Sequence, residues 1–202
     1  MARKSLLLPP PSRVEIKAPE RLAIDMESMH RIHWDRKPYF KWGLCIAYAT
    51  SPRKINYLET VDRRAGLWDL DALHELYEFF TSKEWVFIGH NVFYDLGLIQ
   101  DTFRERLGSK YGLPHCSYQD SMHVWKRQGG IKNSLREVAK RQGVTQKQGG
   151  PNWDLVAQGD PGEWLTMQEY CKGDVRSSFE LVQSFAEDGD PIPVRVWNPK
   201  KS

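Results

Sequence analysis

The segment Arg21-Leu-Ala-Ile-Asp-Met-Glu27 decides the fold, because its residues alternate with the period of a β-strand. Every second residue from Leu22 to Met26 is apolar, whereas Asp25 and Glu27 fall on the opposite face. Their side chains leave the strand about 6.6 Å apart at the backbone, close enough for one cation to lie between them. Mg²⁺ and Mn²⁺ prefer such oxygen ligands. Acidic residues also occur in this pattern on solvated strand faces, so the pair alone does not decide the function.

The sequence around this strand predicts an α/β fold. Two more strands, separated by a Ser-Pro-Arg turn, would form an antiparallel meander with the first. The remaining elements alternate between helices and short apolar strands, and this order predicts a mixed five-stranded sheet with helices on both faces. The expected strands cover 21–27, 42–49, 55–60, 85–88 and a short segment before Asp120. The expected helices are 70–81, one after the strand 85–88, a short one that begins with a capping box at Ser134, and 161–187.

A second acidic motif follows the fourth expected strand, in Ile88-Gly-His-Asn-Val-Phe-Tyr-Asp95. Asp95 falls in the first turn of the next helix, where the helix dipole favours a negative charge. Asn91 has two possible roles at this turn. It could cap the helix, or it could donate a hydrogen bond to a sugar or phosphate of a substrate.

A third motif, Tyr170-Cys-Lys-Gly-Asp174, lies on the last expected helix. A spacing of four residues puts the phenol and the carboxylate on one face, about 6 Å apart along the axis. A phenol beside a metal-bound carboxylate can orient an attacking water. Taken by itself, the motif fits a tyrosine packed on the sheet beside an exposed aspartate better than it fits a catalytic pair.

Together, and in this order, the three motifs resemble those of the DEDD superfamily of exonucleases. The resemblance covers about residues 20–187 and is to the tyrosine type, similar to the proofreading domains of family A and B DNA polymerases. The sister branch has a histidine shortly before the last aspartate, and the last histidine of this chain is His123. The resemblance implies an RNase H-like fold.

The resemblance also implies a two-metal hydrolysis of phosphodiester bonds. Asp25 would bridge two Mg²⁺ or Mn²⁺ ions. Glu27 and Asp174 would complete the site of the ion that activates water, and Asp95 would hold the other ion. Tyr170 would position the nucleophile.

A basic segment lies between the second and third motifs. Residues 126–147 contain seven basic residues against one acidic residue, which favours contact with phosphates. We assign Arg136 and Lys140 of this segment, and Lys172 inside the third motif, to substrate binding. A helix with a solvated basic face is the alternative.

Residues after the acidic strand are further candidates for substrate binding. Ser28 and Met29 follow the strand directly, and the resemblance implies that Met29 wedges against a terminal base. Trp34, Tyr39 and Phe40 could stack on unpaired bases or pack on the domain.

The chain ends differ from the body in composition. Residues 1–20 are predicted to be a basic, proline-rich arm, 21–187 the exonuclease domain and 188–202 a basic tail. The net charge of +3 excludes a polycationic coat protein and a disordered acidic chain. We expect the tails to be the place where a DNA polymerase or another replication protein would bind in trans, with Trp197 as a hydrophobic anchor.

The three cysteines are odd in number and widely spaced, which favours neither a disulfide framework nor a zinc site. A reducing, intracellular setting follows, and we expect the protein to be cytoplasmic. No apolar run approaches the length of a membrane span.

These observations predict a metal-dependent 3′-to-5′ exodeoxyribonuclease that acts mainly on single-stranded or frayed DNA, alone or as a proofreading subunit. One alternative is a 3′-to-5′ exoribonuclease. The other is a weakly active or non-catalytic subunit that docks onto a DNA polymerase through its tails.

Overall fold

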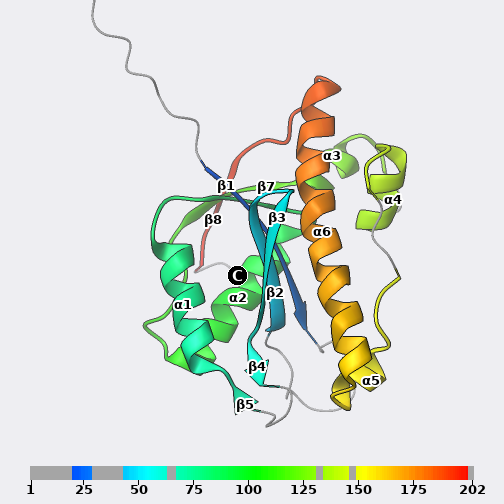
Figure 1. The fold of residues 1–202 in the computed structure, drawn as a ribbon. Coiled ribbons are helices and arrows are strands. Elements are labelled where there is room, and N and C mark those ends of the chain that lie inside the picture. The colour runs from blue at the N-terminus through cyan, green and yellow to red at the C-terminus, as the bar shows by residue number, and fades with distance from the viewer. Residues whose placement is uncertain (1–19, 29–42, 63–66, 131–133, 146–148, 200–202) are drawn as a thin grey trace, which may run out of the picture.

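A six-stranded mixed sheet lies at the centre of the protein (Figure 1). The structure is a computed structural model and describes residues 20–28, 43–62, 67–130, 134–145 and 149–199. The strand order in the sheet is β3-β2-β1-β6-β7-β8, and β4 and β5 form a separate antiparallel pair. The strands are β1 (Arg21–Ser28), β2 (Gly43–Ser51), β3 (Lys54–Glu59), β4 (Val61–Asp62), β5 (Leu67–Trp68), β6 (Val86–Gly89), β7 (Cys116–Asp120) and β8 (Arg195–Trp197).

The carboxyl end of β1 has a paired strand on one side only. β1, β2 and β3 form the predicted antiparallel meander, and β6 and β7 follow as parallel strands. β6 pairs with β1 from Arg21 to Ala23, whereas β2 pairs with β1 from Ala23 to Ser28. Asp25 and Glu27 therefore lie on the part of β1 that extends beyond β6. Ligands commonly bind in this position, outside the carboxyl ends of parallel strands.

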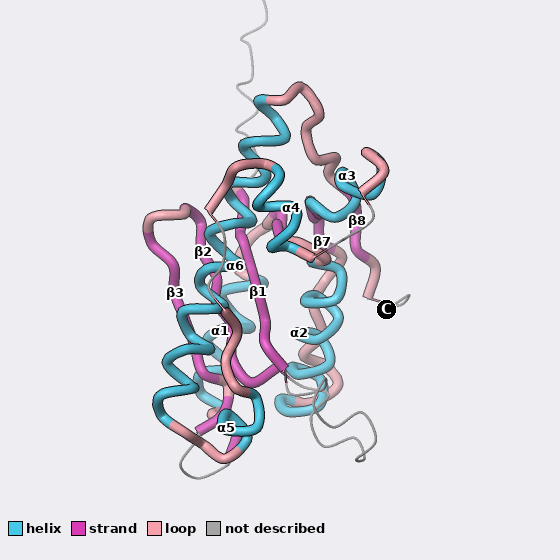
Figure 2. Tube along the Cα trace, turned by 90° about the vertical axis from the view of Figure 1, so that its right-hand side faces the viewer, coloured by secondary structure: helices cyan, strands magenta, loops and turns pink. Residues whose placement is uncertain are grey.

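Helices cover both faces of the sheet, as predicted. Figure 1 shows α1 and α2 on one side and α6, with α4 and α5, on the other. In Figure 2, turned by 90°, the long helix α6 crosses in front of β1, β2 and β3. The helices are α1 (Leu70–Thr81), α2 (Val92–Leu107), α3 (Ser121–Arg127), α4 (Leu135–Arg141), α5 (Trp153–Ala157) and α6 (Pro161–Glu187).

The alternation in β1 divides its side chains between two hydrophobic cores. Leu22, Ile24 and Met26 are buried in the core beneath α1 and α2. Ala23 is buried in the other core, which α6 covers. Since side chains alternate along a strand, Asp25 shares the α6 side with Ala23.

The ends of the helices follow from their capping residues. Oδ1 of Asp69 accepts a hydrogen bond from the N–H of Ala72 at 3.0 Å, and α1 has the predicted bounds. Ser134 caps α4 through the N–H of Glu137, as the predicted capping box requires. α6 begins at Pro161 behind the cap Asp160. A proline fits this position, because the first N–H of a helix has no partner within the helix.

The sheet has one strand more than predicted. β8 pairs antiparallel with β7, so residues 195–197 of the segment 188–202 form part of the sheet. Trp197 is fully buried in the core beneath α1 and α2. The prediction that Trp197 is an exposed anchor for a partner is therefore wrong. Prolines at positions 191, 193 and 199 concealed the strand, although proline is tolerated close to an edge strand.

All three cysteines are free thiols, and Cys45 and Cys171 are buried. Within the described ranges, no helix has both the length and the apolarity needed to cross a membrane.

Candidate active site

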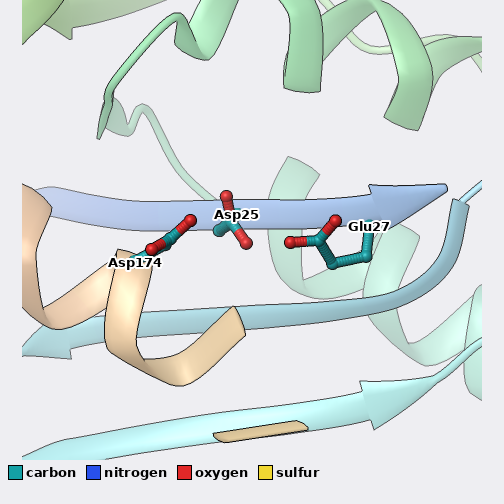
Figure 3. A group of neighbouring side chains, drawn as sticks. All are labelled: Asp25, Glu27 and Asp174. Atoms are coloured by element: carbon teal, nitrogen blue, oxygen red, sulfur yellow. The ribbon is translucent and has the colours of Figure 1, made fainter. Parts of the chain in front are cut away.

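Three carboxylates meet between β1 and α6. Asp25 and Glu27 come from alternate positions of β1, and Asp174 comes from α6 (Figure 3). One oxygen from each lies within 4.8 Å of the others, a geometry that could hold a metal ion. The predicted pair on the strand and the predicted acid on the last helix therefore form one cluster.

A thiol fixes α6 against β1 next to this cluster. Sγ of Cys171 donates a hydrogen bond to the backbone carbonyl oxygen of Asp25 at 3.2 Å. Cys171 follows Tyr170 directly and precedes Asp174 by three residues. This hydrogen bond therefore fixes the position of α6 along β1 at the level of the third motif.

The fourth acid of the motifs, Asp95, approaches β1 from the other side. It lies in the first turn of α2, as predicted, and its carboxylate is buried. Oδ1 accepts a hydrogen bond from the N–H of Met26 at 3.0 Å. This bond ties Asp95 to the residue between Asp25 and Glu27.

Burial and mutual repulsion disfavour the charged forms of Asp25 and Asp95. Burial raises the pKa of Asp25 well above its ordinary value, and the charges of Glu27, Asp174 and Asp95 raise this pKa further. Burial likewise raises the pKa of Asp95, although the hydrogen bond from Met26 opposes the shift. A nearby positive charge would reverse both effects.

The chemistry of the cluster fits a divalent metal ion. Oδ2 of Asp25 is buried and accepts no hydrogen bond from any residue that the structure describes. The described lining of the surrounding cleft contains neither lysine nor arginine. Clustered carboxylates form the all-oxygen site that Mg²⁺ and Mn²⁺ prefer.

The cluster lies in a cleft of about 510 Å³. Tyr170 lines this cleft one turn of α6 before Asp174, so the structure brings the phenol and the four acids together. The residues that line the cleft are Asp25, Met26, Glu27, Ser28, His90, Asn91, Tyr94, Asp95, Met122, Ser134, Leu135, Trp153, Tyr170, Asp174 and Ser178.

Asn91 and Ser28 also lie where the sequence placed them in the site. Asn91 precedes α2, but its side chain makes no capping hydrogen bond to the helix. Its backbone has a left-handed conformation, with φ 67°. Ser28 lies at the end of β1, and its Oγ is 3.5 Å from the hydroxyl oxygen of Tyr94. Met29 falls outside the described residues.

The three predicted basic contacts lie outside the lining of the cleft. Arg136 and Lys140 are exposed on α4, whose first residues do reach the cleft. Lys172 is turned away from it: its ammonium group pairs with Glu169 at 3.2 Å and lies over the ring of Tyr57. The structure therefore does not bring Lys172 to the acids.

Comparisons with known proteins agree with this architecture. No protein-family model matches the chain, and no curated protein matches its sequence. NrnC from Brucella melitensis, in a structure bound to pGG, superposes with a TM-score of 0.53 at 15% identity, over 86% of this chain and 76% of that one. A nuclease in its apo form superposes with a TM-score of 0.51 at 14% identity, over 84% and 75%. This chain has the fold of these nucleases. The predicted RNase H-like fold is confirmed, whereas the tyrosine type and the likeness to polymerase proofreading domains stay predictions.

Two aromatic residues of the cleft were missed at the level of sequence. Tyr94 stands inside the second motif, directly before Asp95, so its position in the motif was an available signal. Trp153 begins α5 after a glycine-rich loop and lies far from every motif in sequence. Only the three-dimensional structure brings Trp153 to the acids. Trp34, Tyr39 and Phe40, which were predicted as stacking residues, fall outside the described residues.

Proposed function

We propose that the protein is a metal-dependent 3′-to-5′ exonuclease of the tyrosine type, which removes nucleotides from single-stranded or frayed DNA. The observation that carries this proposal is the cluster of Asp25, Glu27 and Asp174, whose carboxylate oxygens lie within 4.8 Å of one another. Asp95 and Tyr170 line the same cleft. The nuclease fold supports the same class of reaction.

Asp25, Glu27 and Asp174 would hold a divalent ion, and Asp25 together with Asp95 a second one. Two such ions, when bound, activate a water molecule and offset the charge on the attacking and leaving oxygens. In our proposal the protein supplies the four carboxylates in a fixed arrangement. The hydrogen bonds from Cys171 to β1 and from Met26 to Asp95 maintain that arrangement.

Tyr170 would orient the attacking water through its hydroxyl group. Its position one helical turn before Asp174 lets the hydroxyl approach the acids while the ring stays packed beside Gly150. A phenol hydroxyl can both donate and accept a hydrogen bond. This dual capacity suits a residue that positions water without taking its proton.

The cleft also suits the terminal nucleotides of a single strand. Asn91 and Ser28 would bind the sugar or the phosphate, and the rings of Tyr94 and Trp153 offer surfaces on which bases can stack. Stacking contacts tolerate every base, so we expect little sequence specificity. The pGG bound to NrnC supports a nucleic-acid ligand for this fold. Arg136 and Lys140 would contact phosphates farther from the end.

Digestion of end-labelled nucleic acids tests the proposal. DNA and RNA, each single-stranded, matched and 3′-mismatched, are labelled at the 5′ or the 3′ end and incubated with Mg²⁺ or Mn²⁺. The wild type should release mononucleotides from the 3′ end and shorten 5′-labelled strands stepwise. Asp174→Asn, which removes one carboxylate charge without changing the shape of the side chain, should be inactive. Faster digestion of RNA than of DNA would assign the exoribonuclease alternative.

A wild type as inactive as Asp174→Asn on every substrate would overturn the enzymatic proposal. The non-catalytic subunit that binds a polymerase or another replication protein through its tails would then remain. Asp69→Asn, at the exposed cap of α1, is the matched control, because it makes the same chemical change far from the cleft in sequence and outside its lining.

A further inference from the structure

A fifth carboxylate, Asp120, lies beside the site but outside the three motifs. It ends β7, next to Gly89 of β6, and is 1% exposed. Its Oδ1 accepts two backbone hydrogen bonds, from Asn91 at 2.8 Å and from Met122 at 3.0 Å. Asp120 therefore connects the ends of two neighbouring strands with two residues that line the cleft.

The hydrogen bond from the N–H of Asn91 to Asp120 forms at a residue with an unusual backbone conformation. Among the described residues, Asn91 is the one non-glycine residue with a positive φ. Asparagine tolerates this left-handed conformation better than most residues, but it remains less favourable than the right-handed one by about 1–2 kcal/mol. The hydrogen bond to Asp120 can hold the turn in this conformation.

Asp120 caps α3 through the N–H of Met122, but a cap does not require a carboxylate. Its Oδ2 is buried and accepts no hydrogen bond from the described residues, and Nδ1 of His123 lies 3.9 Å away. Burial of a carboxylate with half of its acceptor capacity unused costs stability. An asparagine would accept the same two backbone bonds at a lower cost, so stability alone does not explain the acid. A charged acceptor forms shorter and stronger bonds to backbone N–H groups, which fits a need for precise position.

The first turn of α2 is thus held at two points. Asp120 holds its beginning through Asn91, and Met26 of β1 holds Asp95 within the first turn. Between these points lies Tyr94, which also lines the cleft.

We infer that Asp120 is a positioning residue, whose carboxylate holds the backbone of Asn91 so that the Asn91 side chain faces the substrate rather than capping α2. The inference rests on the proposed function, because it assigns Asn91 to substrate binding. It places Asp120 outside the metal site: Asp120 touches the site only through its charge, which acts on Asp95, and its main effect is on the affinity for nucleic acid.

Steady-state kinetics on a single-stranded oligonucleotide separate these roles. Asp120→Asn should raise KM about tenfold and leave kcat within about threefold, since a weakened backbone bond displaces a binding group and not the reacting atoms. Its affinity for Mn²⁺, measured by titration calorimetry, should weaken by a far smaller factor than its affinity for the oligonucleotide, because Asp120 acts on Asp95 only through its charge. Asp69→Asn is the control with the same charge change and should alter neither constant.

A double-mutant cycle tests whether Asp120 acts through Asn91. Asn91→Gly removes the side chain and accepts the left-handed backbone without strain. In the Asn91→Gly background, Asp120→Asn should therefore raise KM no further. Additive increases in KM would overturn the inference, and so would a loss of Mn²⁺ affinity in Asp120→Asn as large as its rise in KM.

Amide hydrogen exchange gives a readout that does not need activity. The N–H of Asn91 should be protected in the wild type and should exchange about tenfold faster in Asp120→Asn at unchanged global stability. Equal exchange rates in the wild type and in Asp120→Asn would refute the hydrogen bond from Asn91 to Asp120, even if both proteins are active. If the wild type shows no nuclease activity, the proposed function fails, and the exchange experiment still decides whether Asp120 holds Asn91. If Asp120→Asn does not fold, an unprotected Asn91 amide in the wild type would refute the inference.

Discussion

The backbone N–H of Met26 donates a hydrogen bond to Oδ1 of Asp95 at 3.0 Å, so one peptide unit of β1 contacts an acid on α2. The side chains on either side of Met26, Asp25 and Glu27, contribute to the acidic cluster on the opposite face of the strand. Asp95 therefore has a structural task that is separate from any role as a metal ligand.

Two substitutions at Asp95 separate these tasks. Asp95→Asn keeps an acceptor for the N–H of Met26, whereas Asp95→Ala leaves that buried donor without a partner. We expect Asp95→Ala to lower the free energy of unfolding by about 1–3 kcal/mol, and Asp95→Asn to lower it much less. Both variants should lose nuclease activity. Urea unfolding in the presence of chelator measures the difference, and equal destabilisation by both variants would contradict the structural role.

The acidic cluster predicts that the stability of the metal-free protein falls as the pH rises. The pKa of Asp25 is raised by burial first and then by Glu27, Asp174 and Asp95. Between the ordinary carboxyl pKa and this raised value, the folded protein holds a proton that the unfolded chain has released. Stability is therefore fully present below that interval and is lost as the pH rises through it.

Thermal unfolding with chelator from pH 4 upward measures this dependence. Asp25→Asn should flatten the curve and raise the midpoint of unfolding at neutral pH. In the wild type, free metal at ten times its Kd should stabilise the fold by about 1.4 kcal/mol. A midpoint of unfolding that is the same with and without metal, and the same in the wild type and in Asp25→Asn, would exclude a metal site at the cluster.

Gly150 predicts a test of Tyr170 that leaves its hydroxyl in place. A Cβ at Gly150 would lie 3.3 Å from Cε2 of Tyr170, close enough to displace the ring. A Cβ at the neighbouring Gly149 would meet no atom within 4 Å. We expect Tyr170→Phe to lower kcat on the order of 10²-fold, and Gly150→Ala to lower it several-fold at unchanged affinity for metal. Gly149→Ala should behave as the wild type, and equal kcat values for Gly149→Ala and Gly150→Ala would argue against a role for the exact ring position.

Arg136 and Lys140 lie four residues apart on α4, on the same face of the helix, and are exposed. Reversing both charges to glutamate should weaken the binding of single-stranded DNA. It should also lower the slope of log K against log salt concentration by about 1.4, the value for two lost phosphate contacts. Arg53→Glu with Lys54→Glu, at the exposed turn between β2 and β3, makes the same change in net charge. If the two double variants have the same salt slope, Arg136 and Lys140 do not belong to the surface that binds DNA.

Trp197 should matter for folding rather than for partner binding. Its side chain is fully buried, and Nε1 makes no hydrogen bond to the described residues. We expect Trp197→Ala to lower the free energy of unfolding by about 3–5 kcal/mol. Trp197→Phe should cost less, because it keeps a ring and loses no hydrogen bond. A stability of Trp197→Ala equal to that of the wild type in chemical unfolding would contradict the place of β8 in the sheet.

Periodicity placed the acids on their elements, and the resemblance to the DEDD exonucleases predicted that they form one site. Alternation put Asp25 and Glu27 on one strand face, and a spacing of four put Tyr170 and Asp174 on one helix face. Lys172 shows the limit of reading a motif as a unit. Two residues along a helix correspond to a rotation of about 200°, which turns Lys172 away from Asp174.

Other features of the site depend on contacts between distant segments. Asn91 before a helix has the sequence pattern of a cap, but its backbone is left-handed and its side chain does not cap α2. The partner of its N–H, Asp120, is 29 residues away. β8 has three residues between prolines, too few for a periodic pattern, and forms because β7 offers an edge. Trp153 likewise reaches the cleft only through the packing of α5.

The thiol of Cys171 gives this protein a reporter of its own. It is buried against β1 and bonded to the carbonyl oxygen of Asp25, so a thiol reagent can reach it only after α6 has separated from the strand. Cys116, at the start of β7, is only partly buried, although burial raises its pKa to about 12, and serves as an internal reference for a thiol outside the cluster. The labelling rate of Cys171 relative to Cys116 therefore measures how often the acidic cluster comes apart in the native protein, without any substrate.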